Sequence, residues 1–234
     1  GSINLTGGSV SVTGQDSAGI SIEAPLLGDL RSAAAITVIG ERSYGVHVTA
    51  PVSGAVALTG ASTTATGPGA TALSIEADVG GQVLIDQTVT ATGYRQTTRP
   101  TDAVIATMTA DELQMGGPAV QISGTIGGGV LIAAPPATID ANVADANSDG
   151  LPDSSELTST LTSYGSAPAL QIGGATIATR LGTVSSAWPY GLTLLGTVQG
   201  AGVYDGIATT ALQIGGLGAA ASIDGGVYNY RNVT

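Results

Sequence analysis

One segment of the sequence brings together the residue types that bind calcium. Residues 145–156 read Asp-Ala-Asn-Ser-Asp-Gly-Leu-Pro-Asp-Ser-Ser-Glu. A twelve-position calcium loop has oxygen side chains at positions 1, 3 and 5, glycine at 6, a backbone carbonyl at 7, and further carboxylates at 9 and 12. Gly150 stands where this loop turns sharply. The predicted Ca²⁺ ligands are Asp145, Asn147, Asp149, the carbonyl of Leu151, Asp153 and Glu156.

The residues before this segment do not form the incoming helix of an EF-hand. Residues 138–143 lack helical periodicity, so the loop is closer to the helix-poor calcium loops of extracellular modules. The alternative is a solvated acidic turn rich in Asp, Asn and Ser. Since ligands from the protein would fill most of the coordination sphere, we expect calcium to have a structural role.

Three further side chains could take part in acid–base chemistry. His47 is the only histidine, and Glu23 and Glu76 occupy the same position of a repeated phrase two repeats apart. That spacing predicts a separation on the order of 10 Å, near the upper limit for the carboxylate pair of an inverting glycosidase. We expect a solvated surface at these positions instead, and we predict no catalytic residue.

Arg95 and Arg99 flank a segment that interrupts the repeat. They either clamp an anionic sugar or, as we expect, hold the inserted segment and pair with Asp102. Rings that stand where a turn enters a strand either stack on sugars or, as we expect, pack within the turns. These rings are Tyr44, Trp188 and Tyr190.

A short phrase recurs along the chain and predicts the fold. It reads small, aliphatic, polar, aliphatic, variable, small, and its aliphatic–polar alternation is typical of a strand with one buried face. Stacked copies would form two buried aliphatic columns and one polar column, in which Gln121 and Gln171 form an amide ladder. The seven copies begin at Gly19, Gly45, Ala72, Ala119, Ala169, Gly191 and Ala211.

The spacing of the copies indicates a solenoid. Successive copies are separated by 26, 27, 47, 50, 22 and 20 residues. The short steps have the length of one rung of a right-handed parallel β-helix, and the long steps equal one rung plus an insertion. We therefore predict an all-β single domain over residues 1–234, with roughly seven to nine rungs. The insertions are expected at about residues 98–117, with a helical turn capped by Thr109, and at about 135–164, with the calcium loop.

Glycines mark an expected corner of each rung. Gly14, Gly40, Gly67 and Gly93 recur at intervals of 26, 27 and 26 residues, each after a β-type run. A glycine at a fixed place in every coil predicts a corner with positive φ.

Composition narrows the classes of function. The chain has no Lys, no Cys and no Phe, and its formal net charge is −11. The charge argues against binding to nucleic acid or to an anionic membrane surface, and no apolar run is long enough to insert directly into a bilayer. A core without large rings must be thin and regular, as it is in stacked rungs. The chain starts at Gly1 and ends at Thr234 without a terminating signal, and we expect it to be part of a longer protein.

Several segments resemble bacterial autotransporter passenger domains of the sphingomonad type. The similarity spans most of residues 13–225 and includes residues 92–95, 99–105, 114–122, 149–153 and 202–206. It implies a secreted β-helix on the cell surface, held at the outer membrane by an anchor outside this chain. Such passengers include adhesins, proteases and esterases, but this segment has no serine-protease or lipase signature.

The expected function is therefore that of a non-enzymatic structural or adhesive surface protein stabilised by Ca²⁺. Its expected partners are other cell-surface proteins, glycans or copies of itself. Two alternatives stay open, a β-helical enzyme that degrades polysaccharides and a self-assembling surface-layer or filament module.

Overall fold

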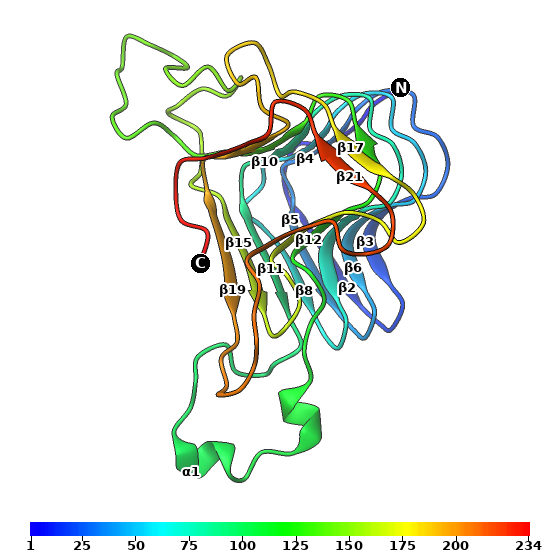
Figure 1. The fold of residues 1–234 in the computed structure, drawn as a ribbon, viewed down its shortest axis with the longest axis vertical. Coiled ribbons are helices and arrows are strands. Elements are labelled where there is room, and N and C mark those ends of the chain that lie inside the picture. Colours follow the sequence, from blue (N-terminus) through cyan, green and yellow to red (C-terminus); the bar gives the residue numbers. More distant parts are fainter.

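The computed structural model describes all residues, Gly1–Thr234, and confirms the predicted parallel β-helix. The chain passes through four parallel sheets in turn, and each strand pairs with the equivalent strand of the neighbouring coil (Figure 1). The longest sheet has seven strands, at the lower end of the predicted number of rungs.

We name the sheets A to D in the order in which the chain visits them. Sheet A contains β1 (Ile3–Leu5), β4 (Leu30–Ser32), β7 (Val56–Leu58), β10 (Val83–Ile85), β14 (Val130–Ile132), β18 (Leu192–Leu194) and β22 (Val227–Asn229). Sheet B contains β2 (Ser9–Thr13), β5 (Ala35–Ile39), β8 (Ser62–Thr66), β11 (Thr88–Thr92), β15 (Thr160–Tyr164) and β19 (Thr197–Ala201). Sheet C contains β3 (Ala18–Ile22), β6 (Tyr44–Val48), β9 (Thr71–Ile75), β12 (Val120–Ile122), β16 (Leu170–Ile172) and β20 (Leu212–Ile214). Sheet D contains β13 (Thr125–Ile126), β17 (Thr179–Leu181) and β21 (Ala221–Ile223), and single bridges extend it through earlier coils.

Aliphatic side chains fill the interior in columns that follow the stacking. Val46, Leu73, Val120 and Leu170 are successive neighbours in sheet C, and all are fully buried. They belong to one apolar cluster of 33 buried residues that runs through the coils. The core is thin enough to be filled by Val, Ile, Leu and Ala alone, as the absence of Phe predicts.

One copy of the repeated phrase lies in a different sheet from the other six. The spacing predicts that Leu192 continues the column of Leu170, but Leu192 pairs with Val130 in sheet A. Leu170 pairs instead with Leu212, so these consecutive coils are separated by 42 residues and the predicted short rungs are wrong. The reason is that alternation of aliphatic and polar residues describes any strand with one buried face, and it does not distinguish one sheet from another.

The column of glycines is required mainly by close packing of backbones. A Cβ on Gly40 would overlap the carbonyl oxygen of Gly14, and a Cβ on Gly67 would overlap that of Gly40. Of the four predicted corner glycines, only Gly67 has a positive φ, of 146°. The left-handed residues of this corner lie two positions later, at Asp16 (φ 52°), Arg42 (φ 50°) and Gly69 (φ 64°).

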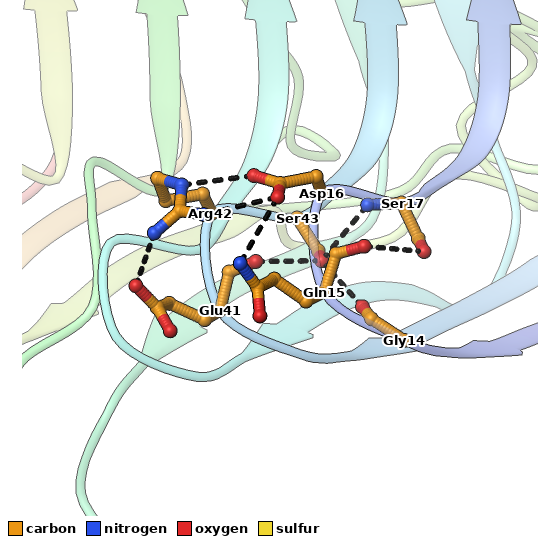
Figure 2. A network of polar contacts seen from close by, with 7 residues as sticks. All are labelled: Gly14, Gln15, Asp16, Ser17, Glu41, Arg42 and Ser43. Atoms are coloured by element: carbon orange, nitrogen blue, oxygen red, sulfur yellow. Dashed lines mark hydrogen bonds and ion pairs between the residues drawn. The ribbon is translucent and has the colours of Figure 1, made fainter.

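Polar contacts tie two neighbouring coils together at this corner (Figure 2). The Arg42 guanidinium donates to both carboxylate oxygens of Asp16, at 2.8 and 2.9 Å, and also contacts Glu41. The Ser43 hydroxyl donates to the carbonyl of Gly14 at 2.8 Å. These bonds satisfy polar groups at the corner and offset the strain of the left-handed Asp16 and Arg42.

The first insertion joins β11 to β12 and carries the only helical turns of the chain. They are α1 (Asp102–Ile105) and the 3₁₀ turn η1 (Ala110–Leu113), which project away from the stacked coils (Figure 1). The predicted turn after Thr109 is confirmed, and the Glu112 carboxylate accepts the Thr109 backbone N–H at 2.9 Å. No helix has the length and apolar character needed to cross a membrane.

Truncating a column residue should destabilise the stack. We expect Leu73→Ala to lower the free energy of unfolding by about 2–5 kcal/mol, because the site is fully buried and flanked by packed coils. Leu27→Ala is the matched control, since Leu27 is 73% exposed. Thermal denaturation followed by circular dichroism makes the measurement, and equal effects of the two variants would contradict the proposed column.

Candidate metal centre

The candidate calcium loop lies in a second insertion that joins sheet A to sheet B. This insertion comprises residues 133–159, between β14 and β15, so that residues 160–164 at the end of the predicted insertion form β15. It leaves the stacked coils beside the chain segment around residues 185–190 (Figure 1). We call the stacked coils without the two insertions the frame.

The insertion covers apolar side chains on the outer face of sheet A. Leu84 and Leu131 belong to a small buried cluster outside the main core, against which Leu151 of the calcium loop packs. β7, β10 and β14 are apolar at all three positions and buried on both faces. Such uninterrupted apolar strands are typical of sheets covered on both sides, so the sequence carried a signal for this cover.

Backbone N–H groups hold the calcium loop in a tight turn. The Asp145 carboxylate accepts the N–H groups of Asp149 and Gly150, at 3.1 and 3.0 Å. The Asn147 side-chain oxygen accepts the Asp149 N–H at 3.2 Å, and both oxygens of Asp153 accept the Ala146 N–H at 3.1 Å. Gly150 has a φ of 95°, which only glycine adopts readily, so the predicted sharp turn is present.

Three of the predicted ligands are buried together with a fourth carboxylate from the frame. The exposed fractions are 8% for Asp149, 2% for Asp153, 9% for Glu156 and 4% for Asp86. Both carboxylate oxygens of Glu156 are buried and have no hydrogen-bond partner. An unpaired buried charge costs several kcal/mol, so an ionised Glu156 without a cation nearby would destabilise the fold.

The burial changes the proton affinity of Glu156. Desolvation is the largest cause, and the neighbouring Asp149, Asp86 and Asp153 carboxylates add to it, so that the pKa of Glu156 is raised to about 8. Burial also raises the pKa of Asp86, against the lowering effect of the Leu157 N–H that it accepts. Without a cation, a proton on Glu156 is the available means of reducing the repulsion.

The carboxylates of the loop do not by themselves form a complete coordination sphere. No group of three or more His, Cys, Asp or Glu side chains is positioned to hold a metal ion. Asp145 and Asp153 direct their oxygens at loop N–H groups instead. The structure thus brings Asp149, Asp153 and Glu156 into one buried acidic cluster, and joins Asp145 and Asn147 to it through the backbone of Asp149.

Aromatic side chains form the wall beside the loop. The Trp188 indole N–H donates to the carbonyl of Asn147 at 3.0 Å, and the Trp188 ring lies 5.1 Å from that of Tyr228. Tyr190 also packs on Tyr228, at 5.3 Å, so Trp188 and Tyr190 both pack on a ring of strand β22 rather than within their own turns. Residues 134–137 line a cavity of about 360 Å³ together with Trp188, Tyr228 and Tyr230.

Side chains on the outer face of sheet C are hydrogen-bonded to one another. His47 Nε2 lies 2.9 Å from Glu76, which also accepts the Ser74 hydroxyl at 2.9 Å. The Tyr44 ring stacks on His47, with ring centroids 3.8 Å apart. The predicted amide ladder forms one coil further along, where Gln171 donates to Gln213 at 3.0 Å.

The arginines of the first insertion are used in ion pairs. Arg99 bonds to Asp102 at 2.8 Å, as expected, and also to Asp205 of a loop between β19 and β20. Arg95 lies 3.9 Å from Glu112. Arg99 therefore holds the insertion against a later coil.

Comparison of the chain with protein-family models, with curated proteins and with solved structures gives no match.

Replacing Glu156 should stabilise the cation-free protein in a pH-dependent way. Since the folded protein raises the pKa of Glu156 from 4.5 to about 8, the wild type loses stability as the pH rises between these values, whereas Glu156→Gln does not. We expect the variant to have a melting temperature a few degrees higher than that of the wild type at pH 8 in chelator. Each kcal/mol added to the free energy of unfolding raises the melting temperature of a chain of this size by about 2–4 °C.

The difference in melting temperature between Glu156→Gln and the wild type should nearly vanish at pH 5. Scanning calorimetry in chelator at both pH values measures it, with the exposed Glu23→Gln as control. A gain of equal size at pH 5 and pH 8 would show that repulsion in the acidic cluster is not its cause.

Proposed function

We propose that this protein is a non-enzymatic structural or adhesive protein of the bacterial cell surface, a passenger-like β-helix stabilised by calcium. The observation that carries the calcium part is the set of buried carboxylates in the second insertion, above all Glu156, whose oxygens have no partner. A cation bound there would neutralise charges that the fold otherwise leaves opposed.

The composition of the site favours calcium among the common cations. Every candidate ligand is an oxygen, from Asp, Glu, Asn or a backbone carbonyl, and the chain has no Cys. Ca²⁺ accepts six to eight such oxygens in irregular geometry, whereas Mg²⁺ requires a near-ideal octahedron. Ion binding is expected to draw the carboxylates of the loop from their N–H partners toward one point.

The surface role is supported by the shape and the charge of the molecule. Stacked coils form an acidic, Lys-free and Cys-free body from which the two insertions project (Figure 1). Such a body presents side chains to cell-surface proteins, glycans or further copies of itself, and its net charge of −11 disfavours nucleic acid. The resemblance to passenger domains supports a location at the outer membrane through an anchor outside this chain.

Calcium should bind and stabilise the second insertion. We expect titration calorimetry to detect binding, and saturation at a hundred times Kd to add about 2.7 kcal/mol to the free energy of unfolding. Chelation should speed hydrogen exchange in residues 140–160 and leave the frame protected.

Asp145→Asn tests the loop directly, since Asp145 holds the first ligand position. The variant should lose most of the calcium affinity. Absence of calcium binding by the wild type at millimolar concentration would remove the calcium proposal and leave the β-helical scaffold.

A second candidate function is a polysaccharide-degrading enzyme acting on the outer face of sheet C. The observation that favours it is the contact of His47 with Glu76, beside a cavity of about 440 Å³ that His47, Tyr44 and Glu23 help to line. His47 and Glu76 are a possible proton-transfer pair.

The structural protein and the enzyme differ in whether a polysaccharide is cleaved. We expect acidic and neutral polysaccharides to be left intact by the wild type, with and without chelator, when products are followed by reducing-sugar assay and chromatography. Cleavage that disappears in Glu76→Gln, with Glu41→Gln as an exposed control, would establish the enzyme instead.

A further inference from the structure

Asp86 belongs to the frame but lies against the calcium loop. It follows β10 at the corner that leads to β11, far from the loop in sequence. Its Oδ1 accepts the N–H of Leu157 at 2.7 Å, and Leu157 is the residue after Glu156. Ser159 then bonds to the frame on both sides of Asp86, donating to the Ile85 carbonyl at 2.9 Å and accepting the Gln87 N–H at 3.2 Å.

No cationic side chain of the protein compensates this cluster. The chain has no Lys, and its one histidine contacts Glu76. Five of the six arginines pair with carboxylates elsewhere, and Arg231 donates to the Pro135 carbonyl in the neighbourhood of the insertion without an ion pair there. The charges of Asp86, Asp149 and Asp153 therefore act on the buried Glu156 carboxylate with no positive charge supplied by the protein.

We propose that one hard divalent cation bridges the frame and the second insertion by drawing the carboxylates of Asp86, Asp149, Asp153 and Glu156 together as ligands, although their oxygens do not converge on one point in this structure. This inference rests on the proposed calcium binding and adds a ligand that lies outside the twelve-position motif. The independent observation that points to a ligand is Glu156, more than nine-tenths buried, with both oxygens unpartnered and its charge opposed by the other three carboxylates.

The bridge gives the cation a mechanical role. A cation bound by the loop alone would order only the turn of the loop. A cation that is also bound by Asp86 fastens the insertion to a corner of the coil. The insertion covers Leu84 and Leu131 on the outer face of sheet A. Loss of the cation would therefore loosen the cover of that face as well as the loop.

Terbium luminescence can test the bridge in the intact chain. Tb³⁺ replaces calcium at oxygen sites, and Trp188, the only tryptophan, lies against the loop through its bond to Asn147. Excitation of Trp188 should sensitise bound Tb³⁺, and displacement by Ca²⁺ then gives the calcium affinity. We expect Asp86→Asn to weaken that affinity at least tenfold, while the amide oxygen still accepts the Leu157 N–H.

Asp78→Asn is the matched control. Asp78 also lies at a coil corner and accepts a backbone N–H, from Thr125 at 2.8 Å, but it is exposed and outside the cluster. Its variant should bind Tb³⁺ and Ca²⁺ as the wild type does. If Asp86→Asn also binds like the wild type while Asp145→Asn does not, the bridge is wrong and the loop proposal stands. If the wild type shows neither luminescence nor calorimetric binding, both are wrong.

Hydrogen exchange of the wild type tests the bridge without a variant, which matters if Asp86→Asn fails to fold. A bridging cation should slow exchange at residues 86–88 of the frame together with residues 145–157. Protection confined to residues 145–157 on addition of Ca²⁺ would overturn the bridge.

Discussion

Parallel hydrogen bonds between successive coils are the constraint on which the rest of this structure depends. They set the spacing of neighbouring strands at about 4.8 Å and place equivalent residues directly above one another. Each interior column must then repeat an aliphatic side chain of similar size, and each close corner must repeat a small residue, as Gly40 and Gly67 do. Any additional residues have to leave the stack, which is why the extra chain length is found in insertions.

The second insertion shows what happens where the chain leaves that pattern. It packs apolar side chains on the outer face of sheet A, and this packing takes Asp86, Asp149, Asp153 and Glu156 out of water at the same time. Carboxylates in such surroundings need a proton, a basic side chain or a cation. The chain has no lysine and none of its arginines forms an ion pair with this cluster, and these two facts favour the proposed cation from solution.

The regular pairing that stabilises the molecule and the irregular surface on which the proposed function rests thus lie in different parts of the chain. The frame supplies regular backbone pairing and a continuous core, and its outer polar side chains largely bond to one another, as His47 and Glu76 do. The insertions supply the irregular surface, the buried acidic cluster and the aromatic wall around Trp188. Under the proposed function, these insertions are the parts that would contact partners.

The sequence alone determined the parallel β-helix, most of its strands, both insertions and the sharp turn at Gly150, because period and turn chemistry are local properties. It did not determine that residues 191–196 lie in sheet A, since aliphatic–polar alternation is the same for every strand with one buried face. It also attributed the corner glycines to positive φ, whereas backbone contact between coils requires most of them. Only the tertiary structure placed Asp86 beside Glu156, because their proximity depends on how a long insertion folds back onto an earlier coil.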